Sequence, residues 1–279
     1  MPESVQDTAG TAAADLAFTS DAHLLARTEI AVRAAGAALR DRFGDVVPYR
    51  TFDELMRALA ANDDTVLDIL RPRLTALRPD ARWVEEELAG GALPAGEWWV
   101  VDPAEGNVNH LHGLPEWAVT ATLVRDNQPV LTVIHLPMTG ETYTALVGAG
   151  AHLDGRPLHV SRTPELGLSI VATSQARPAE DEKVVRRVGA SITEMLVDAL
   201  VVRTSVPATL HLLNVAAGRI EAFWQFAGAR ADLLPGALLV TEAGGRISDV
   251  EGRPWTPGSA SFLAAAPAVH ADAVATLSR

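Results

Sequence analysis

The sequence contains no cysteine, which excludes disulfides, thiolate zinc sites and thiol nucleophiles. Basic residues are also scarce relative to acidic ones, because 23 Lys and Arg against 35 Asp and Glu give a net charge of −12. A nucleic-acid site needs clustered Lys and Arg, so this balance argues against a nucleic-acid partner. An acidic balance fits a protein that gathers carboxylates around cations, although a solvated acidic surface accounts for most of these charges.

Long apolar runs are absent as well. No stretch is long enough to span a bilayer, and the start lacks the basic-then-apolar pattern of a signal peptide. We therefore expect a cytoplasmic protein without membrane association. Hydrophobic residues make up 48% of the 279 residues, enough for a sizeable core in one large domain or two lobes. Residues 1–19, rich in Ala, Thr and Ser, are expected to form a loose tail.

The first half of the chain combines helices with a run of strands. Apolar residues at helical spacing predict one helix from about residue 20 to Gly44 and another over 63–77, which Pro72 should kink or shorten. Four strands separated by turn residues are predicted at 98–101, 117–125, 129–136 and 141–147. Consecutive strands with short turns predict an antiparallel meander.

The second half alternates strands with helices. Strands are predicted at 168–173, 197–203 and 220–226, and helices at about 181–189, from Ser205 to Gly218, and at 233–242 with Asp232 as the cap. This alternation predicts an α/β lobe. The fold class is therefore α/β (α+β). A boundary in the loop 162–167 separates a lobe over 20–162, which carries the antiparallel sheet, from a lobe over 163–279.

Three acidic clusters are candidates for metal ligands: Glu85-Glu86-Glu87, the turn from Asp102 to Asn107, and Asp232 at a predicted helix start. A carboxylate directly after a buried strand lies at the sheet edge, where sites are usually built. A proline-containing turn separates Asp102 from Glu105 and can bring both to one side, and hard cations such as Mg²⁺ prefer oxygen ligands. Gly106 and Asn107 can present backbone N–H groups to an anion. On spacing alone, turn carboxylates and a helix cap explain the same residues.

Two long motifs resemble the signatures of the inositol monophosphatase family. The stretch from Trp99 to Asn109, Trp-Val-Val-Asp-Pro-Ala-Glu-Gly-Asn-Val-Asn, is similar to the first signature. The stretch from Ala231 to Gly245, with Glu242-Ala-Gly-Gly at its end, is similar to the second. The resemblance covers about residues 20–270, and the order of the motifs makes it specific.

The resemblance implies a layered α/β/α/β/α sandwich and a metal-assisted attack of water on a phosphomonoester. It implies metal ligands at Glu85, Asp102, the backbone carbonyl of Ala104, Glu105 and Asp232. It also implies catalytic roles for Glu85, Asp102 and Asn107, and substrate contacts at Gly106, Asn107, Ala208 and Gln225. The expected cofactor is Mg²⁺, with Mn²⁺ as the alternative. The expected partners are a small phosphorylated substrate and a second copy of the chain.

The sequence departs from the family pattern at the site itself. Glu105 replaces an aspartate, which can move a ligand oxygen by more than ~1 Å, a displacement that can cost ~10²-fold in rate. Asn107 replaces a threonine whose hydroxyl helps orient the attacking water. Asn62 falls where the family has an aspartate ligand of an outer metal, although a helix cap explains it equally well. His110 and His112 are expected to be packing or loop residues, because the family ligands there are oxygens.

Two functions follow from this pattern. The leading hypothesis is Mg²⁺-dependent hydrolysis of a small phosphomonoester of the inositol, sugar, nucleotide or histidinol phosphate type, because the carboxylates Glu85, Asp102, Glu105 and Asp232 all survive. The alternative is a family fold with an altered metal site, repurposed for a non-phosphatase reaction in a biosynthetic pathway or for non-catalytic binding.

Overall fold

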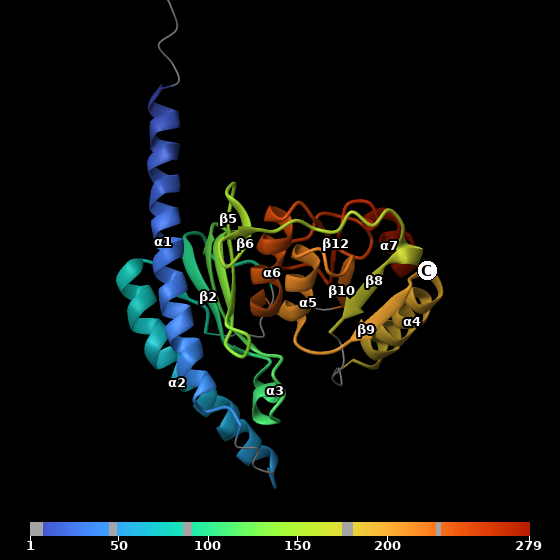
Figure 1. The fold of residues 1–279 in the computed structure, drawn as a ribbon, viewed down its shortest axis with the longest axis horizontal. Helices are drawn as coiled ribbons and strands as arrows, with labels where there is room; N and C mark the ends of the chain where they lie inside the picture. The colour runs from blue at the N-terminus through green and yellow to red at the C-terminus, as the bar shows by residue number, and fades with distance from the viewer. Residues whose placement is uncertain (1–7, 45–48, 86–90, 175–180, 227–229) are drawn as a thin grey trace, which may run out of the picture.

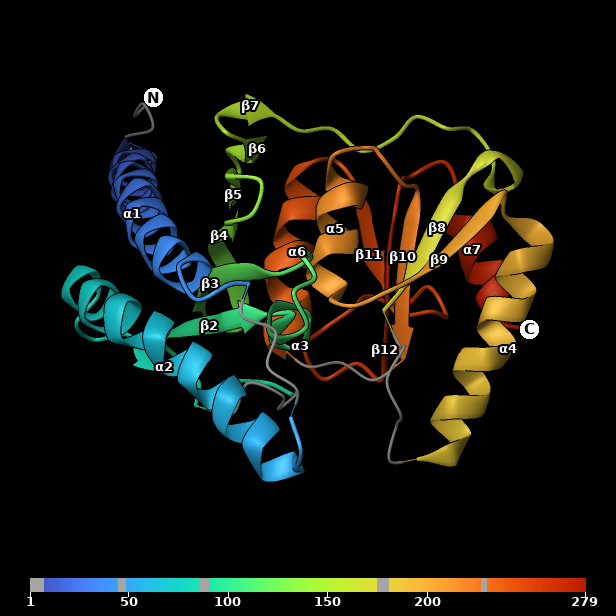
Figure 2. The same ribbon diagram turned by 60° about the horizontal axis from the view of Figure 1, so that its bottom comes forward.

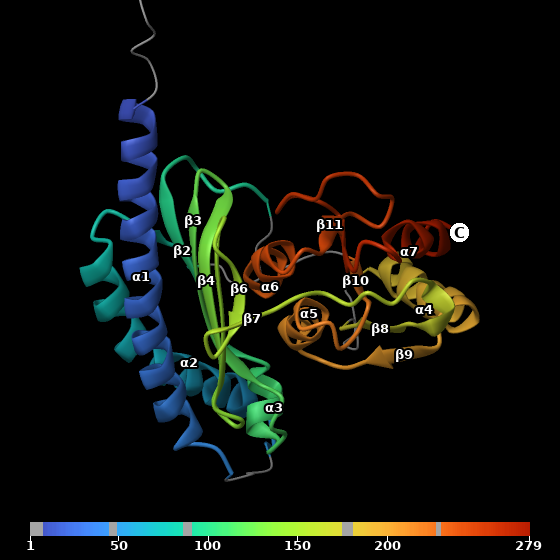
Figure 3. The same ribbon diagram turned by 45° about the horizontal axis from the view of Figure 1, so that its top comes forward.

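The computed structural model describes residues 8–44, 49–85, 91–174, 181–226 and 230–279, and gives only the backbone for residues 8–20 and 230. The elements stack in layers (Figure 1). Helices α1 (Thr8–Arg40) and α2 (Phe52–Leu77) cover the outer face of the first sheet. Helices α5 (Ala208–Ala216) and α6 (Arg230–Glu242) lie between the two sheets, as Figure 3 shows. Helices α4 (Glu182–Asp198) and α7 (His270–Leu277) cover the far face of the second sheet (Figure 2). The predicted α/β/α/β/α sandwich is confirmed.

The first sheet contains seven strands in sequence order. They are β1 (Arg82–Trp83), β2 (Glu97–Glu105), β3 (Ala118–Arg125), β4 (Gln128–Leu136), β5 (Glu141–Leu146), β6 (Gly150–Leu153) and β7 (Arg156–Pro157). Strand β1 runs parallel to β2, and every later neighbour is antiparallel, which confirms the predicted meander. Both faces of this sheet are covered by helices, so its central strands are mostly buried on both sides.

The second sheet contains five strands in the order β11-β12-β10-β8-β9. They are β8 (Ile170–Thr173), β9 (Val201–Thr204), β10 (Ala222–Phe226), β11 (Arg246–Ser248) and β12 (Ser261–Ala265). Strands β8, β9 and β10 are parallel and are linked through α4 and α5, as expected for an α/β unit. The chain passes from one sheet to the other between Pro157 and Ile170, through the 3₁₀ turn η1 (Leu166–Leu168). The division into lobes at 162–163 stays a prediction.

The structure differs from the sequence-based expectations at helix ends and in elements that were not predicted, which are the strands β1, β6, β7, β11 and β12 and the helices α3 (Asn107–Leu111) and α7. Helix α1 begins at Thr8, inside the segment expected to be loose, because this Ala-rich stretch has high helix propensity. Helix α2 begins at Phe52 after the N-cap Thr51, eleven residues before the predicted start at 63, and continues past Pro72 to Leu77. Helix α4 extends to Asp198 rather than 189. The cap positions predicted for Asn62 and Asp232 are wrong, because both residues lie inside helices.

The middle layer joins the two sheets through an apolar core. Helices α5 and α6 pack against each other so closely that a side chain at Gly236 would meet Leu212 at 2.3 Å. The N-terminal end of α6 packs on the first sheet, where Ala231 and Leu234 share a buried cluster with Val100 of β2 and Val124 of β3. A bulkier residue than Ala231 would need space that this cluster now fills. This packing places the start of α6 near the end of β2.

Candidate metal centre

A β-bulge at the end of β2 brings two carboxylates together. Asp102 pairs with Thr120 of β3, and Glu105 pairs with Ala118, so one extra residue lies on β2 between these pairs. In a regular strand, residues three apart face opposite sides of the sheet, and the extra residue cancels this alternation. The Ala104 N–H donates to Oδ1 of Asp102 at 3.0 Å, which closes the turn. Asp102 and Glu105 are 7% and 4% exposed, respectively.

Helix α6 supplies the third carboxylate. Asp232 lies in the first turn of α6, and its backbone carbonyl accepts a hydrogen bond from Oγ1 of Thr209 on α5 at 3.1 Å. One carboxylate oxygen each from Asp102, Glu105 and Asp232 lies within 4.8 Å of the others. Residues more than a hundred positions apart in the sequence therefore form one cluster, between the end of β2 and the start of α6.

The chemistry of this cluster suits a hard cation. Gathering three carboxylates, two of them buried, concentrates negative charge, which is unfavourable unless positive charge or proton uptake compensates it. The ligand atoms are all oxygens, and the bulge also leaves Ala104 without a partner residue in the ladder to β3. Oxygen donors of this kind fit Mg²⁺, Mn²⁺ or Ca²⁺ better than softer metals. The residues present fit the metal that the sequence predicts.

Glu85 lies outside this cluster. Its carboxylate accepts two hydrogen bonds from the Arg71 guanidinium of α2, at 3.0 and 3.1 Å. These bonds lower the pKa of Glu85 below its usual value. The guanidinium also lies 4.7 Å from the ring centre of Trp83, so it is held from two sides. Glu86 and Glu87 of the acidic triplet lie outside the described residues. The metal-ligand and catalytic roles of Glu85 stay predictions.

The two asparagines that depart from the family pattern contact each other. Nδ2 of Asn62 donates to Oδ1 of Asn107 at 2.8 Å, although 45 positions separate them. Nδ2 of Asn107 donates to the Leu59 carbonyl at 3.1 Å and to Oδ1 of Asp63 at 2.8 Å. Asp63 is a residue that the sequence analysis assigned only to a helix start. No sequence signal marks this contact, because it depends on how α2 crosses the end of β2.

His110 is a packing residue, as predicted. Its ring packs against Phe43 and Trp117 at centroid distances of 5.4 and 4.9 Å. Its Nε2 lies 3.1 Å from the Leu39 carbonyl, and its Nδ1 lies 3.0 Å from Nδ2 of Asn62. Burial lowers the pKa of His110 below the ordinary value. A neutral ring with hydrogen on Nε2 satisfies both contacts.

The candidate substrate residues come from three segments. Gly106 has φ of 83°, and a side chain there would meet the Glu116 carbonyl at 2.8 Å, so the turn accepts only glycine without rearrangement. Ala208 begins α5 directly after Pro207, whose ring atom Cγ lies 3.1 Å from the same position. Gln225 on β10 is buried, and its Oε1 accepts a hydrogen bond from Ser174. Gly106 and Ala208 are thus brought close together, and their substrate contacts stay predictions.

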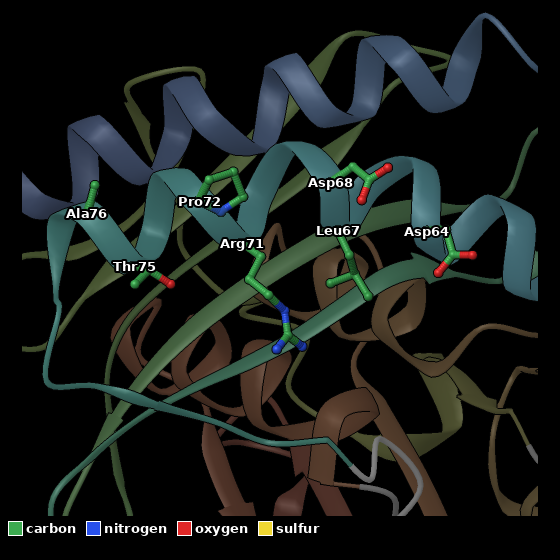
Figure 4. A pocket seen from close by; sticks show the side chains of 7 residues that line it. All are labelled: Asp64, Leu67, Asp68, Arg71, Pro72, Thr75 and Ala76. Atoms are coloured by element: carbon green, nitrogen blue, oxygen red, sulfur yellow. The ribbon is translucent and has the colours of Figure 1, made fainter.

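A hollow of about 780 Å³ lies elsewhere, on the outer side of α2 (Figure 4). It is lined by Asp64, Leu67, Asp68, Arg71, Pro72, Thr75 and Ala76. Figure 4 shows Arg71 pointing away from α1. The three clustered carboxylates are not among the lining residues, so we do not identify this hollow with the candidate metal centre. None of the described helices combines the length and apolar character needed to cross a bilayer.

A layered α/β sandwich with clustered oxygen ligands at the bulge of its first sheet is the architecture of a metal-dependent phosphomonoesterase family. The Inositol monophosphatase family matches residues 22–279, and the chain belongs to this family. It is 32% identical over 235 residues to the inositol-1-monophosphatase of Rhizobium meliloti (strain 1021), covering 82% of this chain and 87% of that protein.

Solved structures agree with this assignment. The inositol monophosphatase of Anabaena (Nostoc) sp. PCC 7120 superposes with a TM-score of 0.77 at 25% identity, covering 92% of this chain and 95% of that chain. The inositol monophosphate-bound SaIMPase-II superposes with a TM-score of 0.74 at 22% identity, covering 91% and 92% of the two chains. The second comparison supports the fold alone.

Proposed function

We propose that this protein hydrolyses a small phosphomonoester with the help of Mg²⁺. The observation that carries the proposal is the cluster of Asp102, Glu105 and Asp232, whose oxygens lie within 4.8 Å of one another at the bulge of β2. These carboxylates, together with the Ala104 carbonyl, would hold the metal. Bound Mg²⁺ would lower the pKa of a coordinated water and neutralise charge on the phosphate. Mn²⁺ is the alternative cation.

The turn after β2 supports a phosphate-binding role. The backbone N–H groups of Gly106 and Asn107 belong to a tight turn at the start of the helix α3 (Asn107–Leu111). Gly106 permits this turn because its φ of 83° and its packing against the Glu116 carbonyl leave no room for a side chain. Ala208 and Gln225 would contact the alcohol portion of the substrate. Glu85 would have to break its ion pair with Arg71 before its carboxylate could bind the metal.

The names of two similar proteins indicate which substrates to test first. The Rhizobium meliloti relative is an inositol-1-monophosphatase, and SaIMPase-II binds inositol monophosphate. Inositol monophosphates are therefore the first substrates to test, followed by sugar, nucleotide and histidinol phosphates. A homodimer is expected from the family resemblance and is tested by sedimentation.

Phosphate release from this panel with added Mg²⁺ tests the proposal. Activity that disappears with a chelator and returns with Mg²⁺ or Mn²⁺ would support it. Inactivity on the whole panel with either metal would contradict it and favour the alternative, a repurposed family fold. That alternative draws support from Asn62 and Asn107, which pair with each other. It also draws support from Glu85, which pairs with Arg71.

A further inference from the structure

The side chain of Asn107 is committed to α2. Its two amide hydrogens are both used, one by the Leu59 carbonyl and one by the Asp63 carboxylate, at 3.1 and 2.8 Å from Nδ2. Its oxygen accepts from Nδ2 of Asn62 at 2.8 Å. A carboxamide has two donor hydrogens and one acceptor oxygen, so these three bonds fix its orientation. Asn107 is therefore anchored to α2.

Asn62 is held as firmly as its partner. It is 1% exposed, and its Oδ1 accepts a hydrogen bond from Nε of Arg42 at 3.0 Å. Its Nδ2 donates to Asn107 and lies 3.0 Å from Nδ1 of His110. His110 presents an acceptor there because its Nε2 is needed as the donor to the Leu39 carbonyl. The orientation of Asn62 is thus set by Arg42, in the turn after α1, and by α3, and both ends of its amide are engaged.

This anchor acts on the segment that carries Glu105. Only Gly106 separates Glu105 from Asn107, and its left-handed backbone is packed against the Glu116 carbonyl. On the other side, Nδ2 of Asn109 donates to the carbonyls of Glu116 and Val206, at 2.8 and 2.9 Å. The turn is therefore tied to α2 through Asn107 and to the segment before α5 through Asn109.

We propose that Asn107 is a positioning residue, and that its bond to Asn62 holds the Glu105 carboxylate in the metal cluster with Asp102 and Asp232. The inference rests on the proposed function, because it concerns the same metal centre. It differs from the role that the family resemblance implies for this position, where a hydroxyl orients water. Here the polar atoms of Asn107 bind α2, so Asn107 acts on the reaction through Glu105. Glu105 is one methylene longer than aspartate and has more rotamers to restrict.

Alanine variants of both asparagines test this inference. Asn62→Ala and Asn107→Ala are each expected to weaken Mg²⁺ binding, measured by calorimetry, by roughly 10- to 100-fold, as for other residues that orient metal ligands. The double variant is expected to bind Mg²⁺ no more weakly than the more impaired of the two single variants, because both changes remove the bond between Asn62 and Asn107. Asn62→Leu, which keeps the volume of a buried side chain, is a second variant if an alanine variant does not fold.

An asparagine outside the Asn62–Asn107 contact provides the control. Asn214→Ala on α5 removes a hydrogen bond to the Leu210 carbonyl and one from the Arg219 guanidinium, neither of which involves α2 or the metal cluster, and it should leave Mg²⁺ affinity unchanged. Unchanged Mg²⁺ affinity in Asn107→Ala with a lower kcat, while Asn62→Ala behaves as wild type, would overturn the positioning role. Thermal unfolding of each variant shows whether it is folded at the temperature of the titration.

The same experiment separates this inference from the proposed function. A wild-type protein that binds Mg²⁺ but releases no phosphate overturns the proposed function alone. The calorimetric comparison of the two alanine variants still tests the positioning role in that case. A wild-type protein that binds no Mg²⁺ overturns both.

Discussion

Two of the regions that hold buried carboxylates surround them with opposite kinds of neighbour. Glu221, between α5 and β10, is 7% exposed and is surrounded by donors. Its oxygens accept from the hydroxyls of Ser161 and Thr163, each at 2.8 Å, and from the Ile170 N–H at 2.7 Å. At the end of β2, by contrast, buried carboxylates lie beside other carboxylates. Burial alone therefore does not mark a metal site, and the identity of the neighbours does.

The carboxylate of Glu221 fastens the segment between the two sheets to β8. Ser161 and Thr163 belong to that segment, and Ile170 begins β8. Glu242 makes a similar connection, because it accepts from the N–H groups of Gly148 and Gly150 in the turn between β5 and β6. Such carboxylates stabilise the fold without needing a cation. The comparison predicts separate consequences for substitutions in the two regions.

The largest effect is expected at the metal cluster. Asp102→Asn keeps the shape of the side chain and removes one negative charge from the cluster. We expect kcat/KM for phosphate release to fall by roughly 100-fold or more, because a metal contributes several kcal/mol and each 1.36 kcal/mol is a factor of ten. The assay is phosphate release at saturating Mg²⁺, with thermal unfolding as the control for folding. Wild-type activity in this variant would remove Asp102 from the proposed site.

The next largest effect is expected at Glu221. Glu221→Ala would leave the Ile170 N–H and two hydroxyls without their acceptor, and we expect the free energy of unfolding to fall by about 2 to 3 kcal/mol. Urea unfolding measures this loss. Mg²⁺ affinity should stay as in the wild type at a temperature where the variant is folded. A loss of Mg²⁺ binding without a loss of stability would break the distinction between the two regions.

A smaller effect is expected from pH, through histidines that lie in neither carboxylate region. Burial lowers the pKa of His135, with further lowering by Arg33 and Arg40 and a partial opposing effect of the Glu141 carbonyl and Asp154. Burial also lowers the pKa of His211, where Arg203 adds to the effect and the Ser205 carbonyl opposes it.

The direction of the pH effect on stability follows from comparing the folded and unfolded states. In the unfolded chain, histidine titrates near pH 6.5. Below this pH the unfolded state binds more protons than the folded state, so stability is fully present above about pH 6.5 and is lost as pH falls towards the lowered pKa. We expect a lower urea midpoint at pH 5.5 than at pH 7.5. His135→Gln cannot titrate and should reduce this difference, and an unchanged difference would argue against a contribution from His135.

The smallest effect is expected at Glu85, which accepts hydrogen bonds as Glu221 does but is exposed to solvent. It is exposed and paired with a guanidinium, and an exposed ion pair contributes about 0–1 kcal/mol. If Glu85 serves as a metal ligand, Arg71→Gln should raise Mg²⁺ affinity by no more than about fivefold, since the competing cation is removed. Glu85→Gln should lower it. Calorimetry on both variants decides the point, and unchanged affinity in Glu85→Gln would remove Glu85 from the ligand set.

Local sequence pattern predicted the longer strands well, placed helix ends poorly, and did not predict β1, β6, β7, β11 and β12 or the helices α3 and α7. The strands predicted at 117–125 and 129–136 match β3 and β4 to within a residue, because an apolar run between turn residues is a local signal. The start of α2 was missed although Phe52, Leu55, Met56 and Leu59 follow the i, i+3, i+4, i+7 spacing of a helix, and Thr51 before them is an N-cap. The tail was misjudged because composition that looks unstructured is also rich in alanine.

The candidate site could be predicted only in part. The resemblance to two signatures named Asp102, Glu105 and Asp232, which the structure brings together. The pairing of Asn62 with Asn107 could not be predicted, because it depends on how α2 crosses the end of β2. The same holds for the contact of Glu85 with Arg71, which depends on the path of the chain between α2 and β1.

The sequence by itself determined the family, the alternation of elements and the identity of the clustered acids, because these are properties of local pattern and of two contiguous motifs. The tertiary structure decided which side chains meet. The bulge in β2 turns Asp102 and Glu105 to one side of the strand. The packing of α6 in one cluster with Val100 places Asp232 near them. The crossing of α2 then engaged Asn107. Contacts of this kind depend on the relative placement of distant elements, which residue spacing along the chain does not specify.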